Sequence, residues 1–274
     1  MNTVRVMSKN AAYQKFEVLR TNRNKRYRYG EFLVEGVRNI NQAIRNGWQF
    51  TSLLYRPETP LSRWAQEVLD TVSCDTHYQL SSNLMQELSG KTDTSELLAI
   101  LRMRPDDPAL LHDSPCPLYI LFDRPSNHGN LGSIIRSADA LGADGLILTG
   151  HGVDLYQPEV ITASMGSFFN LRAIRMADND TVFDWIARQR DLHPGFQVIG
   201  TTAHKQLNIT QVDFRLPTLL MIGNETEGLC RAFKEGCDLL ATIPMADTSS
   251  ASSFNVACAA TVMMYEVCRQ RAQE

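Results

Sequence analysis

The stretch that decides the fold is Thr218-Leu-Leu-Met-Ile222, followed by Gly223-Asn-Glu-Thr-Glu-Gly228. Its first five residues predict a short buried strand, and the glycine-containing turn ends that strand. A second predicted strand ends in Ile243-Pro-Met245, and a loop rich in serine and threonine then leads through Ser253-Phe-Asn-Val256 into a long apolar helix. Loops between a strand end and a helix N-terminus are where α/β proteins place ligands. The two turns therefore predict one small-molecule site.

Strands and helices alternate from residue 118 onward. The predicted strands cover 118–122, 145–149, 171–176, 197–201, 218–222 and 240–244, and the predicted helices cover 130–142, 156–165, 181–190, 229–236 and 252–271. This alternation favours an α/β fold with a largely parallel sheet that helices cover on both faces.

A smaller α/β unit precedes these elements. Its apolar pattern predicts strands at 32–36, 50–55 and 97–101, with helices at 37–46, 62–72 and 81–90. Segment 105–117 contains four prolines and three aspartates without an apolar period, which is typical of a linker. We therefore expect four parts: a basic N-terminal arm at 1–30, a small domain at 31–104, the linker at 105–117 and a second domain at 118–274.

Charge is unevenly distributed along the chain. The formal net charge is -3, yet residues 1–30 carry eight Lys and Arg against one Glu, a local balance of +7. Tyr13, Phe16, Tyr27 and Tyr29 are interleaved with these cations. Such a segment could neutralise phosphates and stack on unpaired bases, or it could be the solvated face of a helix. The segment alone favours neither.

Several classes of protein are disfavoured by the composition. No apolar run approaches the roughly 18 residues of a membrane span, and the N-terminus MNTVRVMSKN lacks the apolar core of a signal peptide. The six cysteines contain no CxxC pair, which favours reduced thiols in a cytoplasmic protein. The six histidines show no HxH or HxxxH spacing, so we expect no metal site.

Another turn of interest follows the first strand of the second domain. After the strand at 118–122, the turn 123–129 leads into a helix whose apolar positions form one stripe, with Arg136 on the opposite side. The GxGxxG fingerprint of dinucleotide-binding proteins is absent, and only Gly129-x-x-Gly132 is present. On this helix alone, Arg136 would be interpreted as an exposed surface residue.

Three motifs change that interpretation. Taken together, Asn130-Leu-Gly-x-x-x-Arg136, Gly223-Asn-Glu225-x-x-Gly228 and Ile243-Pro-Met245 with Ser253-Phe-Asn255-Val closely resemble the motifs of the TrmH (SpoU) family of RNA methyltransferases, within the SPOUT superfamily. Phe32-Leu-Val-Glu-Gly36-Val-Arg38 also resembles the start of the family's accessory RNA-recognition domain, a ribosomal-protein-like α/β fold. The resemblance covers 118–271 and, less closely, 10–104.

The resemblance implies a parallel-sheet catalytic domain closed by a trefoil knot, a rare exception to the usual connection rules. It implies that the knot binds S-adenosylmethionine in a bent shape and that the protein is a homodimer, paired through the region of the final helix. The residues that it places at the cofactor are Thr201, Gly223, Ile243, Met245, Phe254 and Asn255.

The implied reaction is methyl transfer to a ribose 2′-hydroxyl of RNA, with ribosomal RNA favoured over transfer RNA. Arg136 corresponds to the catalytic arginine. Because a guanidinium pKa above about 12 resists deprotonation, we expect Arg136 to hold a phosphate and stabilise developing alkoxide charge. Asn130 and Asn255 would position the ribose and the arginine. Glu225 would orient Arg136 or its own loop, and Ser253 would position the ribose or cap the last helix.

RNA recognition is assigned to the N-terminal part. The candidate RNA-binding residues are Arg20, Arg23, Lys25, Arg26, Arg28 and Arg38.

Two features depart from the family pattern. Phe254 stands where leucine is usual, and the loop 246–252 is about two residues longer than expected. Both affect the shape of the cofactor pocket and remove no polar catalytic group. An alternative function is a non-catalytic RNA-binding or ribosome-associated protein that keeps the fold. The full set of Asn130, Arg136, Glu225 and Asn255 favours the enzyme.

Overall fold

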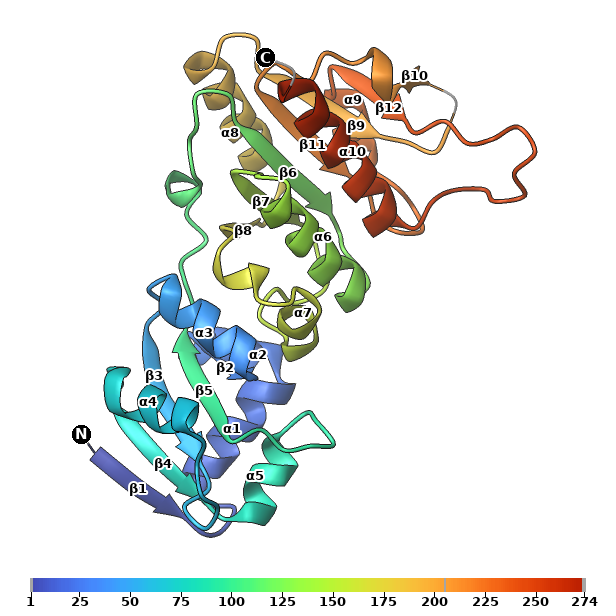
Figure 1. Cartoon of the computed structure of the whole chain (residues 1–274). Helices are drawn as coiled ribbons and strands as arrows, with labels where there is room; N and C mark the ends of the chain where they lie inside the picture. Colours follow the sequence, from blue (N-terminus) through green and yellow to red (C-terminus); the bar gives the residue numbers. More distant parts are fainter. Residues whose placement is uncertain (1, 205, 273–274) are drawn as a thin grey trace. The chain divides into compact units, whose positions relative to one another are not determined.

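The computed structural model describes residues 2–204 and 206–272, which form two compact units (Figure 1). Unit 1 consists of Met1–Arg104 and Asp154–Asn170, and unit 2 consists of Pro105–Val153 and Leu171–Glu274. Each unit has a β-sheet of its own. The chain therefore enters unit 1 twice.

Unit 1 is built on a mixed five-stranded sheet in the order β1-β4-β3-β5-β2. Strands β1, β4 and β3 are parallel, whereas β5 runs antiparallel to both β3 and β2. Its strands are β1 (Asn2–Val6), β2 (Glu31–Glu35), β3 (Phe50–Tyr55), β4 (Thr76–Leu80) and β5 (Leu97–Arg102), and its helices from the first segment are α1 (Ala11–Thr21), α2 (Arg23–Tyr29), α3 (Val37–Arg45), α4 (Arg63–Thr71) and α5 (Ser82–Leu88).

The predicted N-terminal arm is wrong, because this segment is part of the folded unit. Strand β1 pairs with β4, and neither strand was expected from the sequence. Helix α1 buries Tyr13, Phe16 and Leu19 in a core that also contains residues of β2, β4 and β5. The spacing of three along α1 places these side chains on one face, while Lys15 and Arg20 are only partly buried. The prediction weighed the cations of this segment and did not recognise the apolar face of α1.

The second segment of unit 1 comes from the crossover between two strands of unit 2. It contains α7 (Pro158–Ala163) and the 3₁₀ turn η2 (Ser167–Phe169). Phe168 packs against both Phe32 and Trp48, with ring centroids 5.8 and 5.5 Å away, and Trp48 Nε1 donates to the carbonyl of Phe169 at 2.9 Å. The helical pattern at 156–165 does not reveal which unit it packs against.

A buried ion pair joins the two segments of unit 1. The Arg26 side chain is 1% exposed, and its Nη2 lies 2.6 Å from Oδ2 of Asp154, which is 3% exposed. Arg26 Nη1 also donates to the carbonyls of Leu19 and Arg20, and the Tyr27 hydroxyl donates to Asp154. Each charge thus has several partners, as a buried charge requires.

Unit 2 contains a seven-stranded parallel sheet in the order β10-β12-β9-β11-β6-β7-β8, which confirms the predicted α/β class. Its strands are β6 (Leu118–Asp123), β7 (Gly145–Thr149), β8 (Ala173–Met176), β9 (Gln197–Thr201), β10 (Leu207–Asn208), β11 (Thr218–Ile222) and β12 (Leu239–Thr242), and its α-helices are α6 (His128–Ala140), α8 (Asn179–Leu192), α9 (Arg231–Gly236) and α10 (Val256–Arg271). Short 3₁₀ turns occur at η1 (Pro108–Leu110) and η3 (Ile209–Gln211).

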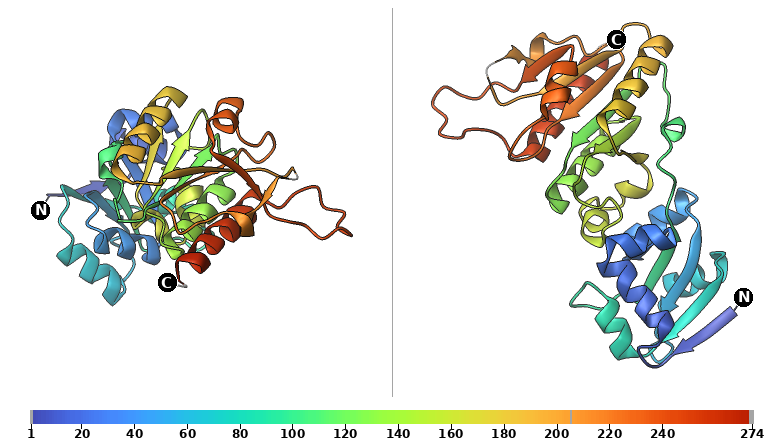
Figure 2. Two further views of the ribbon diagram at one scale, coloured as in Figure 1. Left: turned by 90° about the horizontal axis from the view of Figure 1, so that it is seen from above. Right: turned by 180° about the vertical axis from the view of Figure 1, so that it is seen from behind.

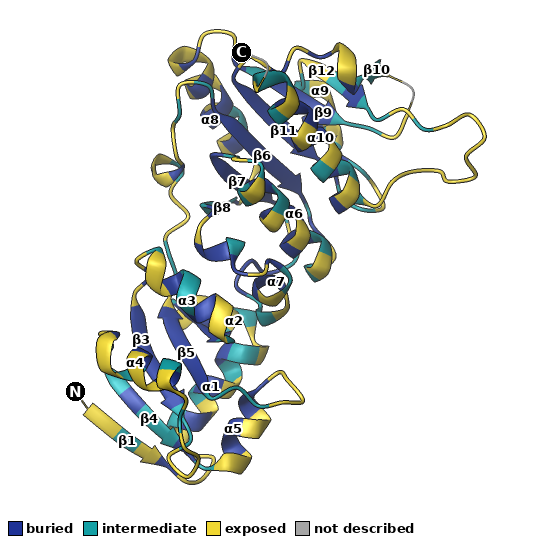
Figure 3. Ribbon diagram, viewed as in Figure 1, coloured by how far each residue is buried: buried dark blue, intermediate teal, exposed yellow. Residues whose placement is uncertain are grey.

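Helices cover this sheet on opposite faces (Figure 2). Trp185 of α8 and Phe233 of α9 belong to one cluster with alternate sheet residues such as Leu121 and Met221. Because successive strand side chains point to opposite faces, Ile120 of β6 points to the other side, where α6 and α10 pack together. The central strands are therefore buried on both faces, as Figure 3 shows.

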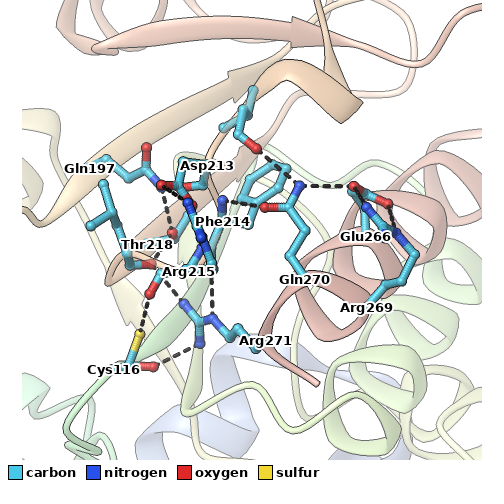
Figure 4. A network of polar contacts seen from close by, with 12 residues as sticks. Cys116, Gln197, Asp213, Phe214, Arg215, Thr218, Glu266, Arg269, Gln270 and Arg271 are labelled. Carbon is cyan, nitrogen blue, oxygen red and sulfur yellow. Dashed lines mark hydrogen bonds and ion pairs between the residues drawn. The ribbon is translucent and has the colours of Figure 1, made fainter. Parts of the chain in front are cut away.

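The C-terminal end of α10 is held by polar contacts (Figure 4). Arg271 donates to the carbonyls of Cys116 at 2.7 Å, Phe214 at 2.9 Å and Leu216 at 2.9 Å. Gln270 accepts from the Phe214 amide at 2.8 Å. These bonds fix the last helix to the segments that enter β6 and β11.

Within residues 2–204 and 206–272, no helix combines the length and apolar content that a membrane crossing requires.

We predict that Arg26→Met lowers the free energy of unfolding of unit 1 by about 3–5 kcal/mol, because it leaves the buried Asp154 carboxylate unpaired. The double change Arg26→Met with Asp154→Leu should cost less than Arg26→Met alone. Urea unfolding followed by tryptophan fluorescence measures this, since Trp48 and Trp64 lie in unit 1.

Arg28→Met on the same helix is the matched control. Arg28 is exposed and forms no hydrogen bond or ion pair with other described residues, so its change should stay within about 0.5 kcal/mol. Equal effects of the two single changes would contradict the assigned importance of the buried pair.

Candidate functional site

The site lies in unit 2, where β6, β9, β11 and β12 end at the same edge of the parallel sheet. The buried carboxylate of Asp123, at the end of β6, organises the first turn. It accepts hydrogen bonds from the Thr149 hydroxyl at 3.1 Å and from the Cys230 amide at 2.8 Å. It also pairs with the neighbouring Arg124 at 3.0 Å. One carboxylate thus joins β6, β7 and the start of α9.

Arg124 extends this connection to the turn after β11. Its backbone has φ of 50°, a left-handed conformation that is uncommon for a residue with a side chain. The guanidinium pairs with Glu227 and donates to the carbonyl of Gly228 at 3.0 Å. The hydrogen bond to Asp123 raises the pKa of Arg124, so its charge is permanent.

The turn 223–228 is closed by its own asparagine. Asn224 Nδ2 donates to the Arg124 carbonyl at 2.7 Å, while Asn224 Oδ1 accepts from the amides of Thr226 and Glu227 at 2.9 and 3.0 Å. A Cβ atom on Gly223 would lie 2.2 Å from the Leu229 amide nitrogen. The close approach of two backbones explains why glycine stands at position 223.

Glu225 connects this turn to the start of α6. Its Oε2 accepts from the amide and hydroxyl of Ser126 at 2.9 and 2.6 Å, and its Oε1 accepts from the Asn127 amide at 3.0 Å and from Asn130 Nδ2 at 3.3 Å. Burial alone would raise the pKa of the Glu225 carboxyl, but the bonds from Ser126 and Asn130, with its own backbone, lower it overall. Glu225 is therefore a charged acceptor at neutral pH.

Asn130 and Asn255 link two helix N-termini. Asn255 Nδ2 donates to Asn130 Oδ1 at 3.2 Å, and Asn255 Oδ1 accepts from the amides of Ala257 and Cys258 as the N-cap of α10. The predicted helix start at 252 is therefore early by four residues, because the cap is Asn255. Glu225, Asn130 and Asn255 form one chain of hydrogen bonds across all three motifs.

Arg136 lies apart from that chain. It is exposed on α6, opposite the buried Leu131, Ile134 and Ile135, as the sequence predicted. Six residues of helix separate it from Asn130, a rise of about 9 Å. Within the described part of the chain, Arg136 forms no hydrogen bond or ion pair, so the structure gives no support to its orientation by Glu225.

A cavity of about 340 Å³ opens beside these turns. The predicted cofactor residues Thr201, Gly223, Ile243, Met245 and Phe254 line it, as do Glu225 and Ser253. Further lining residues are Thr202, Ala203, His204, Asn224, Thr226, Glu227, Gly228, Leu229, Lys234, Thr242, Ser252, Val256, Ala259 and Met263. Asn130, Arg136 and Asn255 are not among the lining residues, so Asn255 lies next to the cavity wall and not in it.

Phe254 departs from the family pattern, and the structure leaves it 45% exposed. It is one of the residues that line the cavity.

The RNA-binding candidates lie in unit 1, and one of them is wrong. Arg26 is buried and fully paired, so it cannot contact a phosphate. Arg20 uses Nη1 to bind the Glu87 carbonyl, and Arg23 lies over the Tyr27 ring, 5.8 Å from its centroid. Lys25, Arg28 and Arg38 have no hydrogen bond or ion pair from their side chains to other described residues.

Sequence reasoning missed several residues. Asp123, Arg124 and Asn224 were seen only as parts of turns, although an Asp-Arg pair at the end of an apolar strand is a usable signal. No cluster of three or more His, Cys, Asp or Glu that could hold a metal occurs among residues 2–204 and 206–272.

Known proteins similar to this chain are RNA methyltransferases. The 23S rRNA (uridine(2479)-2′-O)-methyltransferase of Streptomyces viridochromogenes is 45% identical over 268 residues, which cover 97% of this chain and 92% of that protein. The crystal structure of the SpoU methyltransferase AviRb from the same organism, in complex with AdoMet, superposes with a TM-score of 0.91 at 45% identity, covering 96% of this chain and 98% of that one.

A more distant structure has the same architecture. The AdoMet-bound rRNA methyltransferase from Sinorhizobium meliloti superposes with a TM-score of 0.84 at 28% identity, and the match covers 97% of this chain and 98% of that one. The model of the SpoU L30e-like domain matches residues 10–99. The model of the SpoU rRNA Methylase family matches residues 117–265, and the chain belongs to that family.

Proposed function

We propose that this protein transfers a methyl group from S-adenosylmethionine to a ribose 2′-hydroxyl of ribosomal RNA. The observation that carries this proposal is the chain of hydrogen bonds from Glu225 through Asn130 to Asn255. It unites the three motif turns beside a cavity of a size suited to a nucleoside-like cofactor. The relatives reported above carry out or are named for the same class of reaction.

The cavity fits the proposed cofactor chemically. Apolar side chains of Leu229, Val256 and Met263 line part of it and suit an adenine ring. The backbone at Gly223 and Ile243 offers the polar groups of two strand ends. When bound, the cofactor would supply a methyl group on a sulfonium, which is an electrophile with a good leaving group.

The residues of the chain then have separable roles. Asn130 and Asn255 are held rigidly by Glu225 and by the cap of α10, so their amide groups can position a ribose. Arg136 keeps its charge and has no competing partner among the described residues, which suits it to hold a phosphate and stabilise developing charge on the 2′-oxygen. Ser253 lines the cavity and adds a hydroxyl near the ribose position.

Unit 1 is proposed to recognise the RNA. Lys25, Arg28 and Arg38 are unpaired in the described chain, and exposed Tyr29 adds a ring on which a base can stack. The match to the SpoU L30e-like domain supports this assignment. Ribosomal RNA is the substrate that the family name and the similar methyltransferases favour, and we expect the protein to act in the cytoplasm.

The C-terminal helix supports two further proposals. Val262 and Tyr265 are exposed by 41 and 58%, and helical spacing places exposed Cys258 on the same face of α10. This apolar stripe suits a homodimer interface. We also propose the trefoil knot, because α10 packs on α6 although the preceding β12 is separated from β6 by two other strands, β9 and β11.

We predict that Arg136→Ala lowers methyl transfer by about 10²–10³-fold, since a positioned charge is removed from the reacting centre. The dissociation constant for S-adenosylmethionine should stay unchanged, because Arg136 does not line the cavity. Transfer of labelled methyl to ribosomal RNA lacking the modification measures the rate, and calorimetry measures binding.

Arg188→Ala, which removes an exposed cation from α8, is the control and should keep full activity. A wild-type protein that binds the cofactor but methylates neither ribosomal nor transfer RNA would point to a non-catalytic RNA-binding protein and refute the proposal.

Glu225→Gln should lower the melting temperature of unit 2 at pH 7 by about 2–4 °C, because charged hydrogen bonds to Ser126 and Asn127 become neutral or are lost. The folded-state pKa of Glu225 is lowered, so its stabilisation is present above the ordinary value of 4.5 and is lost as the pH falls through the folded value. Wild type and variant should therefore converge below pH 4.5, as measured by calorimetry over a pH series. A difference independent of pH would contradict a role of the charge.

Tyr265→Asp should convert a dimer into monomers, because it places a charge in the apolar stripe. Light scattering after gel filtration measures the mass. Leu192→Asp is the matched control, since Leu192 is 62% exposed at the end of α8 and lies outside the stripe. A wild-type monomer, or a dimer that survives Tyr265→Asp, would contradict this interface.

A further inference from the structure

The charged side chains around the cavity differ in whether they are already paired. Glu225 is occupied by Ser126, Asn127 and Asn130, and Glu227 is occupied by Arg124. Lys234, on α9, also lines the cavity. Within the described chain, the Lys234 ammonium forms no hydrogen bond or ion pair. It is therefore a cation left without a protein partner in the wall of a binding site.

The acidic groups nearest to Lys234 in sequence are engaged elsewhere. Glu235 pairs with Arg231 at 2.7 Å, and Asp238 pairs with Arg190 at 2.8 Å. Helix α9 thus pairs its other charges internally, and Asp238, which follows the helix, pairs with Arg190 of α8. The ammonium of Lys234 remains available to an anionic group that enters the cavity.

The charges of S-adenosylmethionine define what that group would be. Its methionine part carries a carboxylate, an ammonium and the sulfonium, so one anionic group must be neutralised beside two cationic ones. Glu225 and Glu227 provide negative charge on the turn after β11. Among the described lining residues, Lys234 is the sole Lys or Arg, and His204 is the other basic side chain.

We propose that Lys234 binds the carboxylate of the cofactor's methionine part. This inference rests on the proposed function and assigns one further residue to its cofactor site. A lysine suits the task, because its ammonium is a compact charge with three donors on a flexible stem. The contact is made equally to S-adenosylmethionine and to its demethylated product. Lys234 therefore contributes to cofactor affinity and not to the rate of methyl transfer at saturation.

The test compares three ligands on the full-length protein and on Lys234→Met, which keeps the apolar stem. The ligands are S-adenosylmethionine, S-adenosylhomocysteine and decarboxylated S-adenosylmethionine, with dissociation constants measured by calorimetry. The variant should bind the first two about five- to tenfold more weakly, as expected for one partly exposed charged hydrogen bond. It should bind the decarboxylated compound as tightly as wild type does, and the rate at saturating cofactor should be unchanged.

Arg231→Met is the matched control, because Arg231 is an exposed cation on the same helix that pairs with Glu235 and does not line the cavity. It should leave all three affinities unchanged. Unchanged binding of S-adenosylmethionine to Lys234→Met would overturn the inference, as would an equal loss for the decarboxylated compound. Both results leave the proposed function intact, whereas a wild-type protein that binds none of the three ligands would overturn both proposals.

Discussion

The carboxylate of Asp123 is the interaction on which the candidate site depends. It is 2% exposed, and its partners come from β7, from the start of α9 and from Arg124. A buried charge is tolerated only when such partners are complete. Arg124 in turn contacts Glu227 and the carbonyl of Gly228, and so fixes the turn 223–228 that contains Glu225. The positions of Asn130 and Asn255 therefore depend on a carboxylate that does not line the cavity.

The parallel sheet and most of its helices could be predicted from the sequence. Strands 145–149, 197–201 and 218–222 have the predicted bounds, because each is a short apolar run next to a turn signal. The N-terminal helices could not be assigned, since the many cations of residues 1–30 drew attention away from the buried Tyr13 and Phe16 of α1. The crossover at 154–170 was also missed, because a short helical pattern carries no information about its packing partner.

The candidate site was predictable in its residue types and not in its connections. The motif spacing identified Glu225, Asn130 and Asn255, and the structure joins them by hydrogen bonds. Sequence order could not show that hydrogen bonds join Glu225, Asn130 and Asn255 without including Arg136, nor that Arg26 is buried. The sequence around Arg26 cannot distinguish a cation that binds RNA phosphate from one that pairs with Asp154. The two residues are 128 positions apart, so their pairing leaves no local sequence pattern.

The return of the chain to unit 1 limits how the protein can be divided. A fragment that ends at Arg104 lacks Asp154 and Phe168, so Arg26 would lose its counter-charge and Trp48 would lose its stacking partner. A chimaera that exchanges the recognition unit with that of a relative must therefore transfer residues 154–170 as well. Unit 1 is therefore a discontinuous module. The gene segment that encodes its second piece, residues 154–170, lies inside the segment that encodes unit 2.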